Sequence, residues 1–178
     1  MRRIGITGGI GSGKSVVSRL LRIMGYSVYD TDSEAKRLME SSLEVVQKLS
    51  ECFGRDIYHN GRLNRGLLSS RVFGESDKIV LLNSIVHPVV HFDFYRWSES
   101  LNEEICFVES AILYESRFDE LVDEVWTVTA PEELRISRVR QRSGLTEEEI
   151  KKRMAAQLSE EEKQRRAAHI IWNDGNVS

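Results

Sequence analysis

The chain has 178 residues, of which 40% are hydrophobic and 30% are charged, and its formal net charge is −3. This length suits one domain, or a core with an insertion, that buries a hydrophobic interior of its own. The slightly negative charge argues against a protein that binds nucleic acid through an overall basic field, and no apolar run reaches the length of a membrane span.

A strand is predicted over residues 3–7, followed by the glycine-rich segment 8–15 and by a helix over residues 13–24. The segment reads Gly-Gly-Ile-Gly-Ser-Gly-Lys-Ser, the complete pattern of a phosphate-binding P-loop between a strand and a helix. Its N–H groups would surround phosphate oxygens, the Lys side chain would contact the β- and γ-phosphates, and the last Ser would ligate Mg²⁺. The predicted nucleotide-binding residues in this stretch are Gly8, Gly11, Ser12, Gly13, Lys14, Ser15 and Val16.

A second strand, predicted over residues 27–30, runs into Asp30-Thr31-Asp32. Residues just past the carboxyl ends of parallel strands face the ligand crevice, and strand alternation would direct both carboxylates to one side. Asp32 is therefore a candidate for orienting an acceptor hydroxyl and taking its proton, with Asp30 supporting the site. The alternative is that Asp32 only caps a helix beginning at Ser33, and the spacing alone does not separate the two.

The following segment, residues 32–102, is predicted to be a helical insertion over one face of the sheet, with breaks near residues 53–54, 59–61 and 87–88. His87 and His91 have helical spacing, but Pro88 between them and the lack of a nearby third ligand argue against zinc. Further strands are predicted over residues 105–109, 124–129 and 170–172. They complete an α/β fold of the P-loop nucleoside-triphosphate hydrolase class, with a five-stranded parallel sheet.

A charge-rich helical region over residues 132–166 is predicted to be a mobile lid, with a break at residues 143–144 and a helix cap at Thr146. Arg138 and Arg142, four residues apart, would share a helical face and reach phosphates. A solvated charged surface is the alternative, but a phosphoryl group in transfer needs added positive charge. One P-loop kinase domain is thus predicted over residues 1–178, with its nucleotide-binding core at about residues 1–31, 103–131 and 167–178.

A P-loop alone does not identify the phosphoryl acceptor. The Asn-Lys-x-Asp and Asp-x-x-Gly strings typical of a GTPase do not occur in this sequence. A kinase for another small acceptor, such as a nucleoside, a nucleotide or shikimate, and a nucleotide-binding switch or interaction protein stay open as alternatives.

Several motifs occur in one order along the chain: residues 7–15, Asp30-Thr31-Asp32, Lys36-Arg37, His87-Pro88 and Arg-Met-Ala-Ala-Gln at residues 153–157. In this the chain resembles the dephospho-CoA kinase family over nearly its whole length. The resemblance implies transfer of the γ-phosphoryl group of ATP to the ribose 3′-hydroxyl of dephospho-CoA, the last step of coenzyme A biosynthesis, with Mg²⁺ as cofactor. It further implies catalytic roles for Asp32, Lys14, Arg138 and Arg142, substrate contacts by Asp32, Arg37 and His87, and contacts of Asn173 and Gly175 with the nucleotide base.

The chain departs from the family pattern at a few positions. Val16 stands where a Thr commonly follows the P-loop Ser, so a hydroxyl that could contact the α-phosphate is missing. Glu109 is an additional acid where the family often has Val-Pro, and water-mediated contact with Mg²⁺ is one role for it. The two cysteines, Cys52 and Cys106, lack metal-ligand spacing. The expectation is a cytoplasmic, monomeric enzyme without nucleic-acid or membrane partners.

Overall fold

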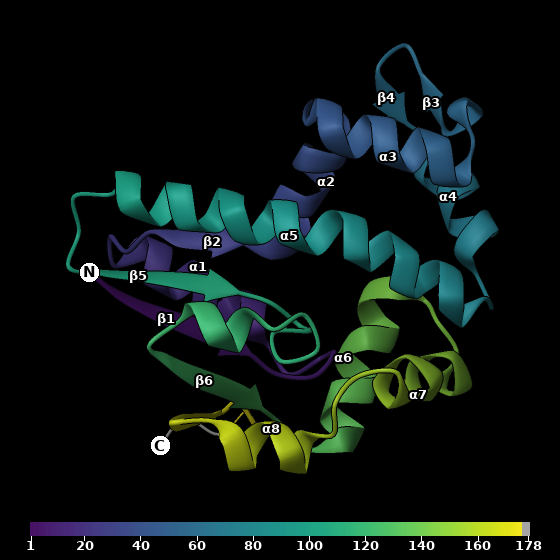
Figure 1. Cartoon of the computed structure of the whole chain (residues 1–178). Helices are drawn as coiled ribbons and strands as arrows, with labels where there is room; N and C mark the ends of the chain where they lie inside the picture. Colours follow the sequence, from purple (N-terminus) through teal and green to yellow (C-terminus); the bar gives the residue numbers. More distant parts are fainter. Residues whose placement is uncertain (176–178) are drawn as a thin grey trace. The chain divides into compact units, whose positions relative to one another are not determined.

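The computed structural model describes residues 1–175 and divides the chain into two compact units (Figure 1). One unit combines Met1–Asp30 with the chain from Leu101 onward, and the other is Thr31–Ser100. Each unit has its own core, and each is described separately below.

The first unit is built on a five-stranded parallel sheet in the order β2-β5-β1-β6-β7. The predicted sheet is thereby confirmed, with strand ends within two residues of the expected ones. The strands are β1 (Arg2–Thr7), β2 (Val28–Asp30), β5 (Ile105–Glu109), β6 (Glu124–Thr129) and β7 (His169–Trp172).

Helix α1 (Lys14–Ile23) packs on one face of this sheet, where Ile4, Ile6, Phe107 and Val128 form a buried cluster with Leu21 of the helix. Alternation sends the intervening strand residues to the other face. That face carries the segment after β5, including η2 (Phe118–Leu121), and helix α8 (Glu160–Arg166), which lies beside β6 in Figure 1. Both faces of the sheet are therefore covered, as the apolar strands require.

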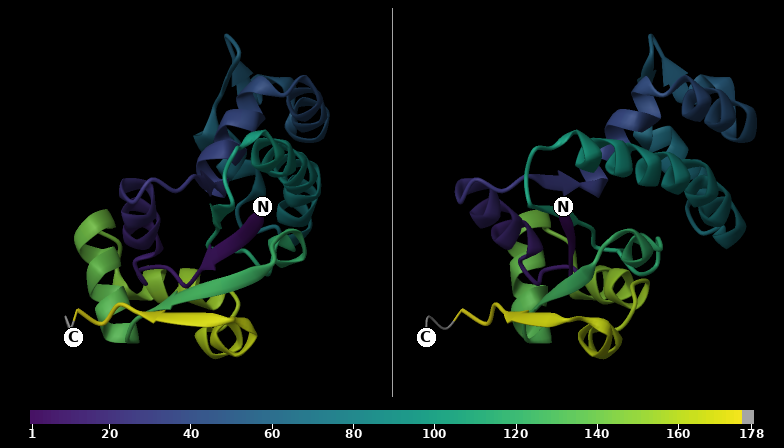
Figure 2. Two further views of the ribbon diagram at one scale, coloured as in Figure 1. Left: turned by 90° about the vertical axis from the view of Figure 1, so that its left-hand side faces the viewer. Right: turned by 60° about the vertical axis from the view of Figure 1, so that its left-hand side comes forward.

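Between β6 and β7 the chain forms α6 (Glu132–Ser143), α7 (Glu147–Ala155) and α8 (Figure 2). Gly144 ends α6 in the left-handed conformation, with φ 67°. Thr146 then caps α7 in a reciprocal capping box with Glu149, as the Thr-x-x-Glu pattern indicates. The predicted break and the predicted cap are both confirmed.

The second unit is mainly helical and differs from the prediction in two places. A two-stranded hairpin, β3 (Tyr58–His59) with β4 (Arg62–Leu63), occurs at the Asn60-Gly61 turn, which sequence reading took only as a break. Pro88 does not interrupt its helix, because the buried Val86, Val90 and Phe94 on either side hold the chain helical despite the lost hydrogen bond. The helical elements are α2 (Thr31–Ser41), α3 (Leu43–Phe53), η1 (Arg55–Ile57), α4 (Arg65–Val72) and α5 (Ser76–Ser100).

Helix α5 is 25 residues long. Even so, neither it nor any other helix within residues 1–175 is apolar enough over a sufficient length to cross a membrane.

Candidate functional site

The glycine-rich loop lies at the carboxyl edge of the sheet, between the end of β1 and the start of α1. The register places Ile6 of β1 opposite Glu109 of β5, and Glu109 in turn opposite Asp30 of β2. On the other side, Thr7 pairs with Thr127 of β6. In open parallel sheets this edge is where ligands bind, and two carboxylates end neighbouring strands there.

Two glycines of the loop are required by close approach as well as by backbone conformation. Gly11 has φ 80°, and a Cβ built on it would lie 2.4 Å from the carbonyl oxygen of Arg135. Gly13 has φ 100°, and its Cβ would lie 2.0 Å from Nδ2 of Asn173. A side chain at Gly11 would therefore push against the backbone of α6, and one at Gly13 would displace the Asn173 side chain from the loop.

Lys14 and Ser15 occupy the first turn of α1, where N–H groups without helical partners and the helix dipole favour an anion. Lys14 Nζ lies 3.5 Å from the carbonyl oxygen of Gly9, so its ammonium is folded back over the loop. Ser15 and Val16 are exposed. The Ser12 hydroxyl is buried and has no hydrogen-bond partner within the described residues.

Helix α6 brings one predicted arginine to the loop and leaves the other in solvent. Arg138 Nη1 lies 3.5 Å from the carbonyl oxygens of Gly11 and Ser12, and its Nη2 lies 3.5 Å from Oδ1 of Asn173. Asn173 itself donates from Nδ2 to the Ser12 carbonyl at 2.9 Å. Arg142, one turn further along α6, is exposed. Gly175 has φ 88° just after β7.

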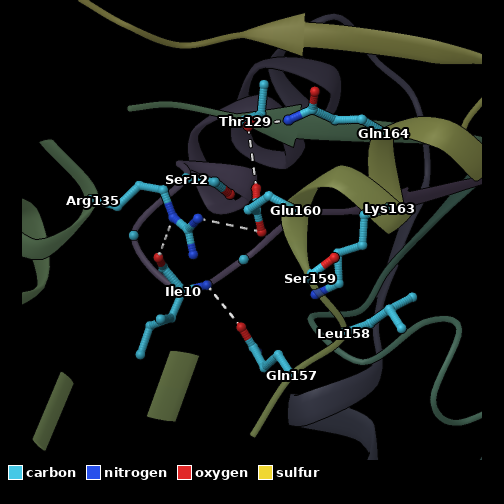
Figure 3. A network of polar contacts seen from close by, with 12 residues as sticks. Ile10, Ser12, Thr129, Arg135, Gln157, Leu158, Ser159, Glu160, Lys163 and Gln164 are labelled. Carbon is cyan, nitrogen blue, oxygen red and sulfur yellow. Dashed lines mark hydrogen bonds and ion pairs between the residues drawn. The ribbon is translucent and has the colours of Figure 1, made fainter. Parts of the chain in front are cut away.

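Sequence reasoning assigned no role to four residues that contact the loop or support it (Figure 3). Arg135 donates from Nε to the Ile10 carbonyl at 3.0 Å and pairs with Glu160 at 3.5 Å. Gln157 accepts from the Ile10 N–H at 3.0 Å. Thr129, at the end of β6, donates to Glu160 at 3.2 Å. Arg135 is one of four arginines within residues 135–142, and Gln157 ends the Arg-Met-Ala-Ala-Gln motif; no sequence signal marked Thr129 or Glu160.

Lys163 of α8 is fully buried beneath this network. Its ammonium donates to the carbonyl of Ala111 at 3.2 Å and lies 3.7 Å from Glu115. Burial lowers the pKa of Lys163, and the nearby Glu115 and Glu160 oppose that effect. Because Glu115 also accepts from the backbone N–H of Leu158 at 2.7 Å, it ties the segment before α8 to the segment after β5.

The structure corrects the local geometry expected around Asp32. Strand β2 ends at Asp30 and α2 begins at once with Thr31, so strand alternation does not extend to Asp32. The predicted helix start at Ser33 is also wrong, because Asp32 lies inside the first turn and does not precede it. A carboxylate in a first turn still interacts favourably with the helix dipole.

Arg37 and His87 belong to the second unit, and their partners are defined there. Arg37 pairs with Asp93 at 2.7 Å and with Glu34, and the two carboxylates raise its pKa. His87 is half-buried on α5, with its ring stacked on that of His91 at a centroid distance of 6.4 Å. Burial, and secondarily the neighbouring His91, lowers the pKa of His87, so this side chain is mainly neutral at pH 7.

Comparison with known proteins identifies the family. The model of the family described as dephospho-CoA kinase matches residues 2–178. The chain belongs to the dephospho-CoA kinase family. A dephospho-CoA kinase of Porphyromonas gingivalis is 44% identical over 97% of this chain and 86% of its own length. One of Corynebacterium diphtheriae is 39% identical over 99% of this chain and 90% of its own.

Solved structures agree with the family assignment. A Thermus thermophilus protein has a TM-score of 0.85 and 38% identity, covering 98% of this chain and 90% of its own. A dephospho-CoA kinase from Campylobacter jejuni has a TM-score of 0.73 and 25% identity, with 99% and 90% covered. A shikimate kinase from Acinetobacter baumannii, at 18% identity and a TM-score of 0.55 over 100% and 86%, shares the fold.

Proposed function

We propose that this protein transfers the γ-phosphoryl group of ATP to the ribose 3′-hydroxyl of dephospho-CoA, giving coenzyme A and ADP. The observation that carries the proposal is the P-loop, at the carboxyl edge of a parallel sheet, in a chain that belongs to the dephospho-CoA kinase family over nearly all its length. The loop and the first turn of α1 supply the N–H groups that bind phosphates, and Lys14 supplies the mobile cation. Asn173 and Gly175 are proposed as contacts for the base.

The residues at this edge of the sheet fit a Mg²⁺ ion. Ser15 offers a hydroxyl in the first turn of α1, and the carboxylates of Asp30 and Glu109 end adjacent strands in register. These are the hard oxygen donors that Mg²⁺ prefers. Within residues 1–175 no group of three acidic, His or Cys side chains forms a cage, which suits a cation held largely by waters and substrate phosphates. When bound, the ion would neutralise charge on the β- and γ-phosphates, with Ser15 as its protein ligand.

Asp32 is proposed as the carboxylate that orients the acceptor hydroxyl and accepts its proton as the new P–O bond forms. Its place in the sequence supports this role, two residues past the end of β2 and in a helix first turn. His87 and Arg37 are proposed to contact dephospho-CoA. Arg37 is already paired with two carboxylates. To bind a substrate phosphate, its guanidinium would have to keep these partners and add the phosphate, or replace one of them with it.

We further propose that residues 132–166 act as a lid and that Thr31–Ser100 contributes the acceptor-binding part of the enzyme. Arg138 supports this assignment, because its guanidinium is already within 3.5 Å of two loop carbonyls. Cations in such a position stabilise charge that develops on the transferring phosphoryl group. Arg142 is proposed to join Arg138 when the acceptor and nucleotide are bound.

A coupled assay for ADP release with ATP, Mg²⁺ and dephospho-CoA tests the proposal, with shikimate and nucleosides as alternative acceptors. We expect turnover with dephospho-CoA and none above background with the others. Lys14→Ala is the matched negative control, since it removes the phosphate-binding cation but leaves the loop backbone. Turnover with another acceptor and not with dephospho-CoA would overturn the assignment of the acceptor, and undiminished turnover in Lys14→Ala would overturn the role of the loop.

A further inference from the structure

Ile10, in the middle of the P-loop, is held by side chains at both of its backbone polar groups (Figure 3). Its N–H donates to Oε1 of Gln157 at 3.0 Å, and its carbonyl accepts from Nε of Arg135 at 3.0 Å. The Ile10 N–H is thus committed to protein and is not offered to a phosphate. Gln157 and Arg135 lie 147 and 125 residues from Ile10 in the sequence, so these two hydrogen bonds form only in the folded chain.

The two side chains are themselves fixed. Arg135 is 5% exposed, and Glu160 pairs with its Nη1 through Oε1 and accepts from Thr129 through Oε2. Thr129 in turn accepts from Nε2 of Gln164 at 3.2 Å. The backbone next to Gln157 is also anchored, because Leu158 donates its N–H to Glu115 at 2.7 Å. The two side chains that contact Ile10 are therefore anchored to the end of β6, through Thr129, and to the segment after β5, through Glu115.

Peptide geometry carries the effect of Gln157 to the phosphate-binding lysine. In a trans peptide the C=O of one residue points opposite to the N–H of the next. Fixing the Ile10 N–H towards Gln157 therefore fixes the Gly9 carbonyl in the opposite direction. That carbonyl accepts from the Ser12 N–H at 3.1 Å and lies 3.5 Å from Lys14 Nζ. One peptide unit thus links Gln157 on one side to Ser12 and Lys14 on the other.

The same geometry applies at the next peptide. Arg135 holds the Ile10 carbonyl, so the Gly11 N–H is directed away from Arg135. Gly11 tolerates this arrangement at φ 80°, and a glycine loop without such partners would sample many other conformations. A loop whose N–H groups are already aimed binds phosphate without first losing that entropy.

We propose that Gln157 is a positioning residue. Together with the ion pair of Arg135 and Glu160, it holds the P-loop in its phosphate-binding conformation before a nucleotide binds. This rests on the proposed binding of ATP by the loop but not on the identity of the acceptor. Loss of the hydrogen bond between Gln157 and the Ile10 N–H should weaken the binding of a nucleotide, because the loop would contact its phosphates less well. It should leave the acceptor site unaffected.

The test measures ADP binding to the full chain by isothermal titration calorimetry in the presence of Mg²⁺. Gln157→Leu keeps the approximate size and removes the acceptor. We expect its ADP dissociation constant to rise about three- to tenfold, the scale of one lost hydrogen bond. Gln157→Glu keeps an oxygen for the Ile10 N–H, and in 0.3 M salt, which screens its added charge, it should bind ADP more tightly than the Leu variant. Gln141→Leu, at an exposed position of α6, is the matched control and should bind like the parent.

Steady-state kinetics then separates positioning from general support of the fold. In Gln157→Leu the KM for ATP should rise in step with the ADP dissociation constant, while the KM for dephospho-CoA stays within twofold of the parent. The proposal is overturned if the Leu variant binds ADP within twofold of the parent, if the Glu variant gives no recovery, or if both KM values rise together. A parent that binds ADP but does not phosphorylate dephospho-CoA would refute the proposed function and leave this test intact.

Discussion

The ion pair between Arg135 and Glu160 should contribute far more to the free energy of unfolding than the distance between its charged groups suggests. The two groups are 3.5 Å apart, and their side chains are 5% and 17% exposed. Arg135→Met removes the positive charge and leaves the Glu160 carboxylate largely buried, with a neutral hydroxyl, that of Thr129, donating to it. Breaking a buried pair in this way costs about 3–5 kcal/mol. For a chain of this size that corresponds to a fall in melting temperature of roughly 6–20 °C.

An exposed pair in the same protein provides the comparison. Arg117 and Glu120 approach to 2.8 Å, closer than the buried pair, but their side chains are 75% and 56% exposed. Water and salt screen such a pair, so Arg117→Met should shift the melting temperature only slightly. If distance decided the contribution, the order of the two effects would be reversed.

Thermal denaturation followed by circular dichroism measures both effects. The double variant Arg135→Met/Glu160→Gln should recover much of the loss of the single Arg135→Met variant, because the uncompensated carboxylate is gone. A double variant that is as unstable as the sum of the two single variants would show that the charges do not interact. Equal shifts for Arg135→Met and Arg117→Met would refute the argument from burial.

The remaining predictions concern the acceptor side, the lid and pH. Asp32→Asn should melt near the parent temperature, bind ADP comparably and lose on the order of a hundredfold in kcat, and parent-like turnover would reject Asp32 as the base. Arg138→Ala and Arg142→Ala should lower kcat more than they raise the KM for dephospho-CoA, with the opposite split placing them in the acceptor pocket. Because the pKa of His87 is lowered in the folded state, the unfolded chain binds the extra proton first, so stability falls as pH drops through about 6.5. His87→Gln should flatten that slope in melting curves taken from pH 7.5 to 5.5, and an unchanged slope would contradict the assignment.

The parts of the fold that could be predicted from sequence are those that local chemistry determines. Apolar runs ended by polar residues gave the five strands, and the Gly-x-x-x-x-Gly-Lys-Ser pattern gave the loop and the start of α1. The capping box of Thr146 and Glu149 is similarly local, since both partners lie within one helical turn. In each case the groups that stabilise the element are neighbours in the chain.

The features that the sequence analysis predicted wrongly or missed depend on packing in the folded chain. Pro88 disfavours a helix locally, but the buried Val86 and Val90, two residues away on either side, override that preference. The hydrogen bond between Gln157 and Ile10 joins groups 147 residues apart, and a single sequence contains no spacing rule for such a pair. Arg135 is one of four arginines within residues 135–142, and nothing in the sequence distinguishes it from the others. Its burial against Glu160 and its hydrogen bond to the Ile10 carbonyl set it apart from the exposed Arg142.

These contacts also limit which part of residues 132–166 can act as a moving lid. Arg135 and Arg138, on the first half of α6, touch carbonyls of the loop, and Gln157 holds the Ile10 N–H. A motion that carried either end away would break these contacts with the P-loop. Closure that preserves the loop must therefore be confined to the chain between Arg138 and Gln157. That stretch contains α7 and the exposed Arg142, so the role proposed for Arg142 is compatible with fixed ends of the region.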